Sequence, residues 1–143
     1  MWLEKNVPYP FAPANIRIHP LTHLDRDEAG ETVLVCHIQF LDPWGESVRG
    51  VGNLKVSLFG PGRPVPVQDA LWSFDLNELK TNNALYDPAT RTYRLQLGDL
   101  PAWAVDLGGD KGNASGGSIY AELTMLGLND QMVTVSGRAV LRR

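Results

Sequence analysis

Apolar and polar residues alternate with a period of two along most of the chain after residue 14, which is the pattern of half-buried β-strands. The longest such segment, ETVLVCHIQFL, places Leu34, Cys36, Ile38 and Phe40 on one face. Its other face is also largely apolar around His37, so only partial exposure is expected there. The pattern therefore predicts a central strand.

Shorter alternating segments predict the other strands. The first runs from Asn15 to Ile18 and ends at Pro20, and others cover 54–59, 70–76 and 90–97. The last two, 118–126 and 132–141, are joined by the short polar loop GLND, which suits an antiparallel hairpin. The residues expected to face the core in these strands are Leu54, Val56, Leu58, Trp72, Phe74, Leu76, Tyr93, Leu95, Leu97, Ile119, Ala121, Leu123, Met125, Val133, Val135, Gly137 and Ala139. For the last two strands, the residues offset by one position are the alternative core set.

Helical signals are scarce. Only the segment DLNELKTNNALYDPA suits a helix, with Asp75 and Glu78 spaced as a capping box, and it predicts one or two turns. Several short strands, frequent turns and at most one short helix predict an all-β antiparallel sandwich of about seven or eight strands.

The chain length and the distribution of proline set the expected domain organisation. A chain of 143 residues suffices for one core, so a single domain is predicted over 14–143. Residues 1–13 contain Pro8, Pro10 and Pro13 and predict an extended arm or linker. Such an arm is expected either between the domain and a preceding domain, membrane anchor or lipid anchor, or strapped onto the domain itself.

Charge and composition exclude several classes of partner. The net charge of -3 gives no attraction for a phosphate backbone, so nucleic acid is not an expected partner. No apolar run approaches the roughly 18 residues of a membrane span. The single cysteine, Cys36, cannot form an internal disulfide, and its place on a core face predicts an inert buried thiol.

The turn after the central strand carries a family resemblance. Residues Asp42 to Gly50 read DPWGESVRG, the pattern D-x-x-G-x-x-V-x-G, between HIQFL and LKVSLFG. This resembles the strand-turn-strand unit of bacterial Ig-like and transthyretin-like sandwich domains, including the carboxypeptidase regulatory type. The insertion VGN, residues 51–53, departs from that pattern. The resemblance implies a structural or binding accessory without catalytic residues, in the cell envelope or periplasm, although the sequence itself does not fix a location.

Within this turn, Asp42 is expected to hydrogen-bond to its own turn backbone, while Gly45 supplies a positive φ. Trp44 is expected to fold over the hairpin as a structural ring. Trp103, in LPAWAVD, also lies near a turn. If either ring is exposed, it offers a surface on which a sugar can stack, so a carbohydrate-binding module is the alternative hypothesis.

Two groups of residues suggest metal ions. Asp25, Asp27 and Glu28, in the loop between the first two predicted strands, make calcium a candidate ligand, and a solvated charged turn is the favoured interpretation. His19 and His23 are four residues apart, a spacing that joins imidazoles only on a helix, which Pro20 disfavours. The strand parity of His37 sets it apart from them, so no transition-metal site and no other cofactor is predicted.

Catalytic motifs are not found in the sequence. It has no G-x-S-x-G elbow and no phosphate-binding G-x-x-x-x-G-K-[ST] order, so a hydrolase is a distant third hypothesis. The leading hypothesis is a non-enzymatic structural or protein-interaction module of a bacterial cell-envelope protein. Its expected partner is another protein or a second copy, bound through exposed strand edges.

Overall fold

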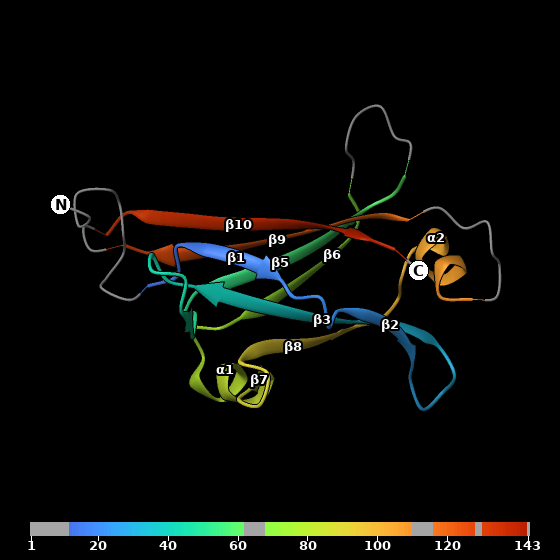
Figure 1. The fold of residues 1–143 in the computed structure, drawn as a ribbon, viewed down its shortest axis with the longest axis horizontal. Coiled ribbons are helices and arrows are strands. Elements are labelled where there is room, and N and C mark those ends of the chain that lie inside the picture. Colours follow the sequence, from blue (N-terminus) through green and yellow to red (C-terminus); the bar gives the residue numbers. More distant parts are fainter. Residues whose placement is uncertain (1–11, 62–67, 110–115, 128–129, 143) are drawn as a thin grey trace.

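The structure, a computed structural model, describes residues 12–61, 68–109, 116–127 and 130–142. Within these ranges the chain forms ten strands and two short helices. The strands make two antiparallel sheets that enclose one apolar core, so the predicted all-β sandwich is confirmed (Figure 1). The strands outnumber the predicted seven or eight because three short strands of two to four residues, β2, β4 and β7, were not predicted.

The first sheet is built around the predicted central strand. Its strands are β1 (Asn15–Ile18), β2 (His23–Arg26), β3 (Thr32–Leu41), β4 (Ser47–Val48), β7 (Tyr86–Asp87) and β8 (Thr92–Leu97). β1 and β2 pair with one side of β3, β8 and β4 pair with the other, and β7 continues beyond β8. β3 is central because its apolar side chains occupy both faces.

The second sheet contains four strands in the order β10-β9-β5-β6. These are β5 (Asn53–Phe59), β6 (Gln68–Asp75), β9 (Gly117–Leu126) and β10 (Met132–Leu141). β9 alternates strictly between buried and more exposed residues, as expected for a strand with one face on the core. β6 and β10 form the two edges of this sheet, and their core-facing side chains are only partly buried.

The core lies between the two sheets and follows the predicted alternation. Leu34, Cys36, Ile38 and Phe40 of β3 are fully buried, as is Tyr93 of β8. Ile119, Ala121, Leu123 and Met125 of β9 meet them from the second sheet, and Leu54, Val56 and Leu58 of β5 complete the centre. The core sets predicted for these strands are therefore confirmed.

The two sheets approach each other closely where β1 passes the inner face of β10. A Cβ atom on Gly137 would lie 2.3 Å from the Ile16 carbonyl oxygen, so only glycine lets the two backbones approach this closely. Ile16 is itself nearly buried in the core. β1 and β10 therefore close one side of the sandwich, as the upper part of Figure 1 shows.

The predicted turn geometry after β3 is confirmed. The Asp42 carboxylate accepts hydrogen bonds from the backbone N–H groups of Trp44 and Glu46, both at 2.9 Å. Gly45 adopts a φ of 83°, and its N–H donates to the Asp42 carbonyl. Asp42 is buried although it is charged, because its carboxylate is occupied by this turn.

The short helix predicted within residues 75–89 is found, but its cap and the presence of a second helix differ from the sequence expectation. α1 (Leu79–Leu85) has Glu78 at its N-cap without a side-chain cap bond, so the capping box is wrong. Asp75 instead accepts two hydrogen bonds from Asn77. A second helix, α2 (Ala102–Leu107), was not predicted. It lies beyond the first sheet's β8 and buries Ala104 and Leu107.

A buried polar network links α1 to the two sheets. The Asn82 side-chain amide donates to the carbonyl oxygens of Gly50 and Leu76, at 2.6 and 2.9 Å. Its oxygen accepts the Tyr93 hydroxyl hydrogen at 2.7 Å. The Gly50 N–H donates to the same hydroxyl oxygen. Asn82 thus forms hydrogen bonds with three buried polar groups, the Gly50 and Leu76 carbonyls and the Tyr93 hydroxyl.

Most of the predicted arm, residues 1–11, lies outside the described residues. Ala12 and Pro13 are buried, and the Ala14 N–H donates to the Leu41 carbonyl oxygen at 2.7 Å. The described end of the arm is therefore packed on the sandwich. In the described ranges no helix has the length and apolar character needed to cross a bilayer.

Candidate interaction surfaces

The two tryptophans chosen as candidate ligand contacts lie in different surroundings. Trp44 is 59% exposed at the β3–β4 turn. Trp103 is half-buried, and its indole N–H donates to the Asp69 carboxylate at 2.9 Å. The Trp103 ring also covers Gly117, where a Cβ atom would lie 2.4 Å from it. Trp103 therefore holds α2 against the end of the second sheet, which leaves Trp44 as the exposed ring of the pair.

The candidate calcium residues are not arranged as one ligand set. Asp25 lies on β2, which the sequence pattern had placed in a loop, and its carboxylate accepts the Arg26 N–H at 2.8 Å. Asp27 accepts the Glu31 N–H at 2.9 Å, which closes the β2–β3 turn. Glu28 is exposed at the tip of that turn. Among the described residues no three or more potential metal ligands come together, so the calcium site stays a prediction.

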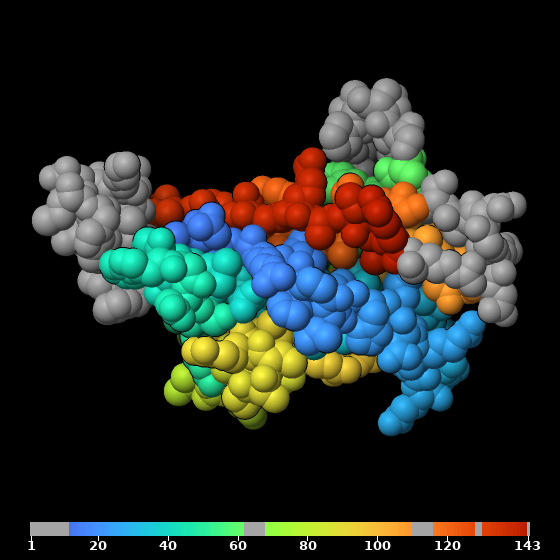
Figure 2. All heavy atoms as spheres, in the orientation of Figure 1, coloured from blue at the N-terminus to red at the C-terminus, as the bar shows by residue number. Residues whose placement is uncertain are grey.

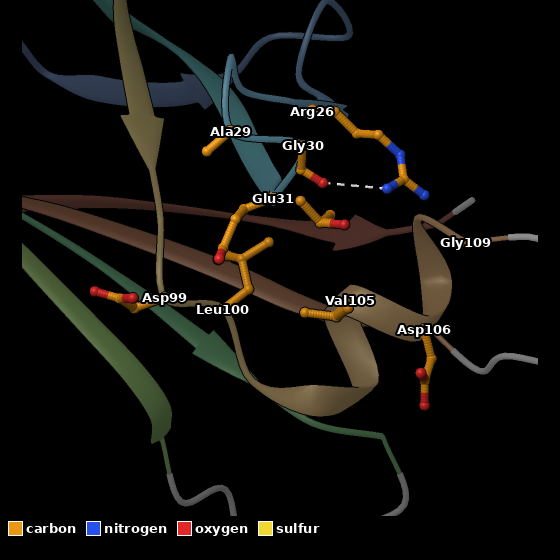
Figure 3. A pocket seen from close by; sticks show the side chains of 10 residues that line it. Arg26, Ala29, Gly30, Glu31, Asp99, Leu100, Val105, Asp106 and Gly109 are labelled. Atoms are coloured by element: carbon orange, nitrogen blue, oxygen red, sulfur yellow. Dashed lines mark hydrogen bonds between the residues drawn. The ribbon is translucent and has the colours of Figure 1, made fainter.

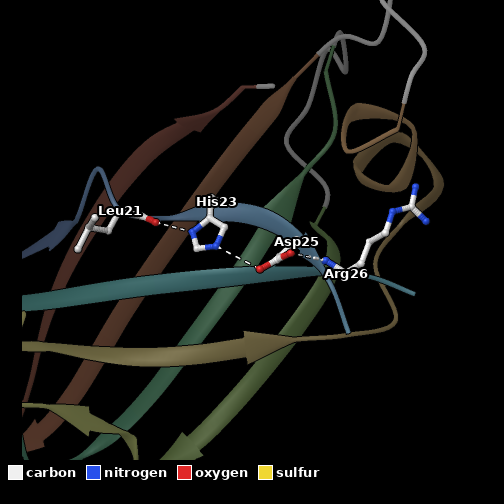
Figure 4. A network of polar contacts seen from close by, with 4 residues as sticks. All are labelled: Leu21, His23, Asp25 and Arg26. Carbon is white, nitrogen blue, oxygen red and sulfur yellow. Dashed lines mark hydrogen bonds and ion pairs between the residues drawn. The ribbon is translucent and has the colours of Figure 1, made fainter. Parts of the chain in front are cut away.

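The histidines are closer together than strand parity suggested. β2 pairs with β3, so His23 lies next to Val35 and its ring stacks on His37 with 6.5 Å between centroids. Figure 4 shows His23 between the Leu21 carbonyl, 2.7 Å from Nδ1, and the Asp25 carboxylate, 3.6 Å from Nε2. The prediction that His37 lies apart from His23 is therefore wrong, because the sequence pattern did not identify β2 as a strand.

His37 is the buried member of this group. Its Nδ1 is hydrogen-bonded to the Thr92 hydroxyl at 3.0 Å, and the Thr90 hydroxyl lies 2.7 Å from that of Thr92. Burial lowers the pKa of His37, and the nearby Arg94, His23 and His19 lower it further, while Asp87 opposes them. The folded protein therefore keeps His37 neutral at neutral pH.

This neutral histidine predicts a loss of stability in mild acid. Below the ordinary histidine pKa of 6.5, the unfolded chain binds a proton that folded His37 resists. Its contribution is complete above that pH and is lost as the pH falls toward the lowered folded pKa. Thermal melts between neutral and mildly acidic pH should therefore show a falling Tm for the wild type and a flatter profile for His37→Gln. Parallel profiles would contradict this role of His37.

The outer face of the first sheet is hollowed beside these histidines. Val33 and Val35 of β3 form the floor of a hollow of about 540 Å³. Arg94 and Gln96 of β8 stand on one side, and the opposite wall is formed by residues 25–29. The walls carry charges of both signs, so the hollow has no single electrostatic preference.

A second hollow, of about 640 Å³, separates the β2–β3 turn from α2 (Figure 3). Leu100 and Val105 line it, together with the acidic side chains Glu31, Asp99 and Asp106. Arg26 is also at this hollow, and its guanidinium donates to the Gly30 carbonyl at 3.2 Å. The lining thus combines apolar side chains with an excess of acidic ones.

The predicted inertness of Cys36 agrees with its surroundings. The thiol is fully buried on the core face of β3. Burial raises its pKa to about 12, and a hydrogen bond with Thr22 opposes this only in part. A thiolate is the reactive form of cysteine, so Cys36 is a poor nucleophile at neutral pH.

The edges of the two sheets differ in how well they are protected from strand pairing. In the first sheet the outermost strands have only two to four residues. β6 has eight residues, but it carries Asp69 and Asp75 and faces a register shift at Leu58/Phe59. β10 has ten residues, no proline, and Arg138 as its single charge. β10 is thus the least protected edge among the described strands.

The hydrogen-bond alternation identifies which groups of β10 point outward. The Gly127 N–H donates to the Gln131 carbonyl at 2.6 Å, in register with the Met132–Leu126 pair of the hairpin. Odd-numbered residues of β10 therefore bond to β9, because hydrogen-bonded pairs alternate in an antiparallel ladder. The outward N–H and C=O groups belong to Met132, Thr134, Ser136, Arg138 and Val140.

The side chains of β10 leave this edge accessible. Arg138 turns over the ring of Tyr120 on the neighbouring strand β9, 5.8 Å from its centroid. Met132 and Val140 are 61% and 60% exposed. Figure 2 shows β10 in red along the upper border of this face of the molecule. Within the described part of the chain, a row of backbone groups without a strand partner thus runs between two exposed apolar side chains.

Sequence reasoning anticipated strand edges as binding surfaces but did not single out β10. The sequence signal was present in MVTVSGRAVL, which is rich in β-branched residues and poor in charge. Its edge position comes from the strand order, which the sequence does not fix. Comparison of the chain with protein-family models, with curated proteins and with solved structures gives no match, so function must be inferred from this surface geometry.

Proposed function

We propose that this chain is a non-enzymatic protein-interaction module whose β10 edge accepts an extended strand. The observation that carries the proposal is the ten-residue, unprotected edge with five residues whose backbone groups point outward. Pairing at such an edge supplies affinity through main-chain hydrogen bonds, while alternate side chains give specificity. The resemblance of the Asp42–Gly50 turn to bacterial accessory domains supports a place in a cell-envelope protein.

The other hypotheses have weaker support. A carbohydrate-binding role keeps Trp44 as its exposed ring, since Trp103 is half-buried and bonded to Asp69. A single exposed ring is a small platform compared with an edge ten residues long.

A hydrolase has weaker support. A third hollow, beside β2 and α2, is lined by Thr22 and His23, but the Thr22 hydroxyl accepts the backbone N–H of His37 at 3.0 Å. The ring nitrogens of His23 are directed to the Leu21 carbonyl and the Asp25 carboxylate, so this pair is not arranged as a nucleophile with its base.

Proline substitution tests the edge directly. Ser136→Pro removes an outward N–H without breaking a bond to β9, so the fold should be kept while strand pairing is blocked. Ser73→Pro is the matched control, because Ser73 is an exposed serine whose N–H points outward from the other edge, β6. The probes are two blocked, fluorescently labelled peptides, one with the sequence of residues 132–141 and one of alternating threonine and valine.

Fluorescence polarisation should show saturable peptide binding to the wild type and to Ser73→Pro, and loss of binding to Ser136→Pro. Thermal melts of both variants verify that each remains folded. If neither peptide binds a wild type that sediments as a monomer, or if Ser136→Pro binds as the wild type does, the proposed function is wrong.

A further inference from the structure

The outward residues of β10 are arranged symmetrically about Ser136. If two β10 strands pair antiparallel with Ser136 opposite the partner's Ser136, then Thr134 faces the partner's Arg138 and Met132 faces the partner's Val140. All five outward residues of each strand then lie in hydrogen-bonded positions. If the two-fold axis lies at Val135 or Gly137 instead, one outward residue of each β10 strand has no β10 residue opposite it.

The same register covers the exposed apolar side chains. Met132 and Val140 are the two strongly exposed apolar residues of β10, and they lie on the same face at its opposite ends. Pairing about Ser136 brings each Met132 against the partner's Val140, and this happens twice because of the symmetry. Apolar cross-strand pairs of this kind stabilise antiparallel sheets.

The inner face is also self-complementary in this register. Val133, Val135 and Ala139 are only half-buried in the single chain. In the pair, Val133 faces the partner's Ala139, and Val135 faces the partner's Gly137. These are the closer, non-hydrogen-bonded positions of the ladder.

Charge does not oppose the pairing. Arg138 is the only charged residue of β10. The two arginines would be offset by four residues, about 14 Å at the rise of an antiparallel strand. This separation exceeds the Debye length of about 8 Å at physiological salt. Each guanidinium is also directed toward Tyr120 of its own chain.

We propose that two copies of this chain pair antiparallel through β10 about a two-fold axis at Ser136, which joins their four-stranded sheets into one sheet of eight strands. The proposal rests on the proposed function, because it takes the same edge and names a second copy as its occupant. The two-fold arrangement also fixes a closed dimer, because each β10 edge is used up by the other.

Single cysteines test this register. In hydrogen-bonded pairs the Cα atoms are about 5.5 Å apart, within the range that a disulfide spans. Native Cys36 is fully buried and gives an unreactive background. After mild oxidation, Ser136→Cys should run mainly as a covalent dimer on a non-reducing gel. Thr134→Cys and Arg138→Cys should each run as a monomer on this gel when oxidised alone. When the two variants are mixed before oxidation, they should form a covalent dimer. Ser73→Cys, on the edge of β6, is the matched control.

Sedimentation of the unmodified protein provides the second measurement. The wild type should sediment at twice the mass of Ser136→Pro at micromolar concentration. A monomeric wild type, or dimer formation by Ser136→Cys no greater than by Ser73→Cys, overturns self-pairing. If the alternating peptide still binds the wild type in that case, the proposed function stands and only the identity of the occupant is wrong. If peptide binding is also missing, both proposals fail.

Discussion

Replacing Asn82 with alanine is expected to lower the free energy of unfolding by about 3 kcal/mol, because it removes three hydrogen bonds from buried polar groups at once. The carbonyl oxygen of Leu76 loses its side-chain donor, and the carbonyl of Gly50 keeps only the longer bond from the Tyr93 hydroxyl, at 3.3 Å. The Tyr93 hydroxyl in turn loses its shorter acceptor, the Asn82 side-chain oxygen, and keeps only the Gly50 carbonyl. All three residues come from different parts of the fold, so no local rearrangement replaces the missing amide.

Chemical denaturation followed by intrinsic fluorescence measures this loss. The neighbouring Asn83→Ala is the control, since Asn83 is exposed and its side-chain oxygen accepts a hydrogen bond from the exposed Arg49. Its effect should stay within about 0.5 kcal/mol. Tyr93→Phe should fall between the two, because it removes the hydroxyl but keeps the ring. Equal stability of Asn82→Ala and Asn83→Ala would show that the network does not stabilise the fold.

Gly52→Ala is expected to destabilise the protein by at least about 3 kcal/mol, through backbone strain and steric overlap together. Gly52 has a φ of 149°, a conformation that residues with a side chain rarely adopt. A Cβ atom there would lie 2.3 Å from the Thr124 carbonyl oxygen of β9. The Gly52 carbonyl also accepts the Leu76 N–H at 2.8 Å, so the residue is held from both sides.

Gly98→Ala is the control for this substitution. Nothing lies within 4 Å of a Cβ atom at Gly98, and its φ is not in the positive region. Its effect on the unfolding midpoint should be small or slightly stabilising, because alanine restricts the unfolded chain. If Gly52→Ala and Gly98→Ala unfold at the same denaturant concentration, β9 and β5 are less tightly apposed than the structure places them.

Long apolar strands were predictable from sequence, and short polar ones were not. β3 was recognised because its alternation extends over ten residues. β2 was missed because Leu24 is its only apolar residue, and its strand conformation depends on pairing with β3. This error also misplaced Asp25 in a loop and separated His23 from His37.

The second helix is signalled in the sequence by the residues at its ends and not by a periodic pattern. Pro101 stands at its N-cap and Gly108 at its C-cap, the residue types that begin and end helices. The role of Trp103 followed from this helix, since α2 places its indole on Gly117 and Asp69. By contrast, the prominence of β10 depends on the strand order, which arises from contacts between distant segments and cannot be read from local pattern.

The contact between β1 and β10 has a consequence for folding. Ile16 contacts Gly137, so the first described strand, β1, packs against the last one, β10. A chain emerging from the ribosome exposes the inner side of β1 and β3 until its C-terminal hairpin has been synthesised, and non-local contacts of this kind make folding slow. Nascent chains are therefore expected to depend on chaperones at this stage, and truncation within β10 should prevent folding rather than merely shorten a sheet.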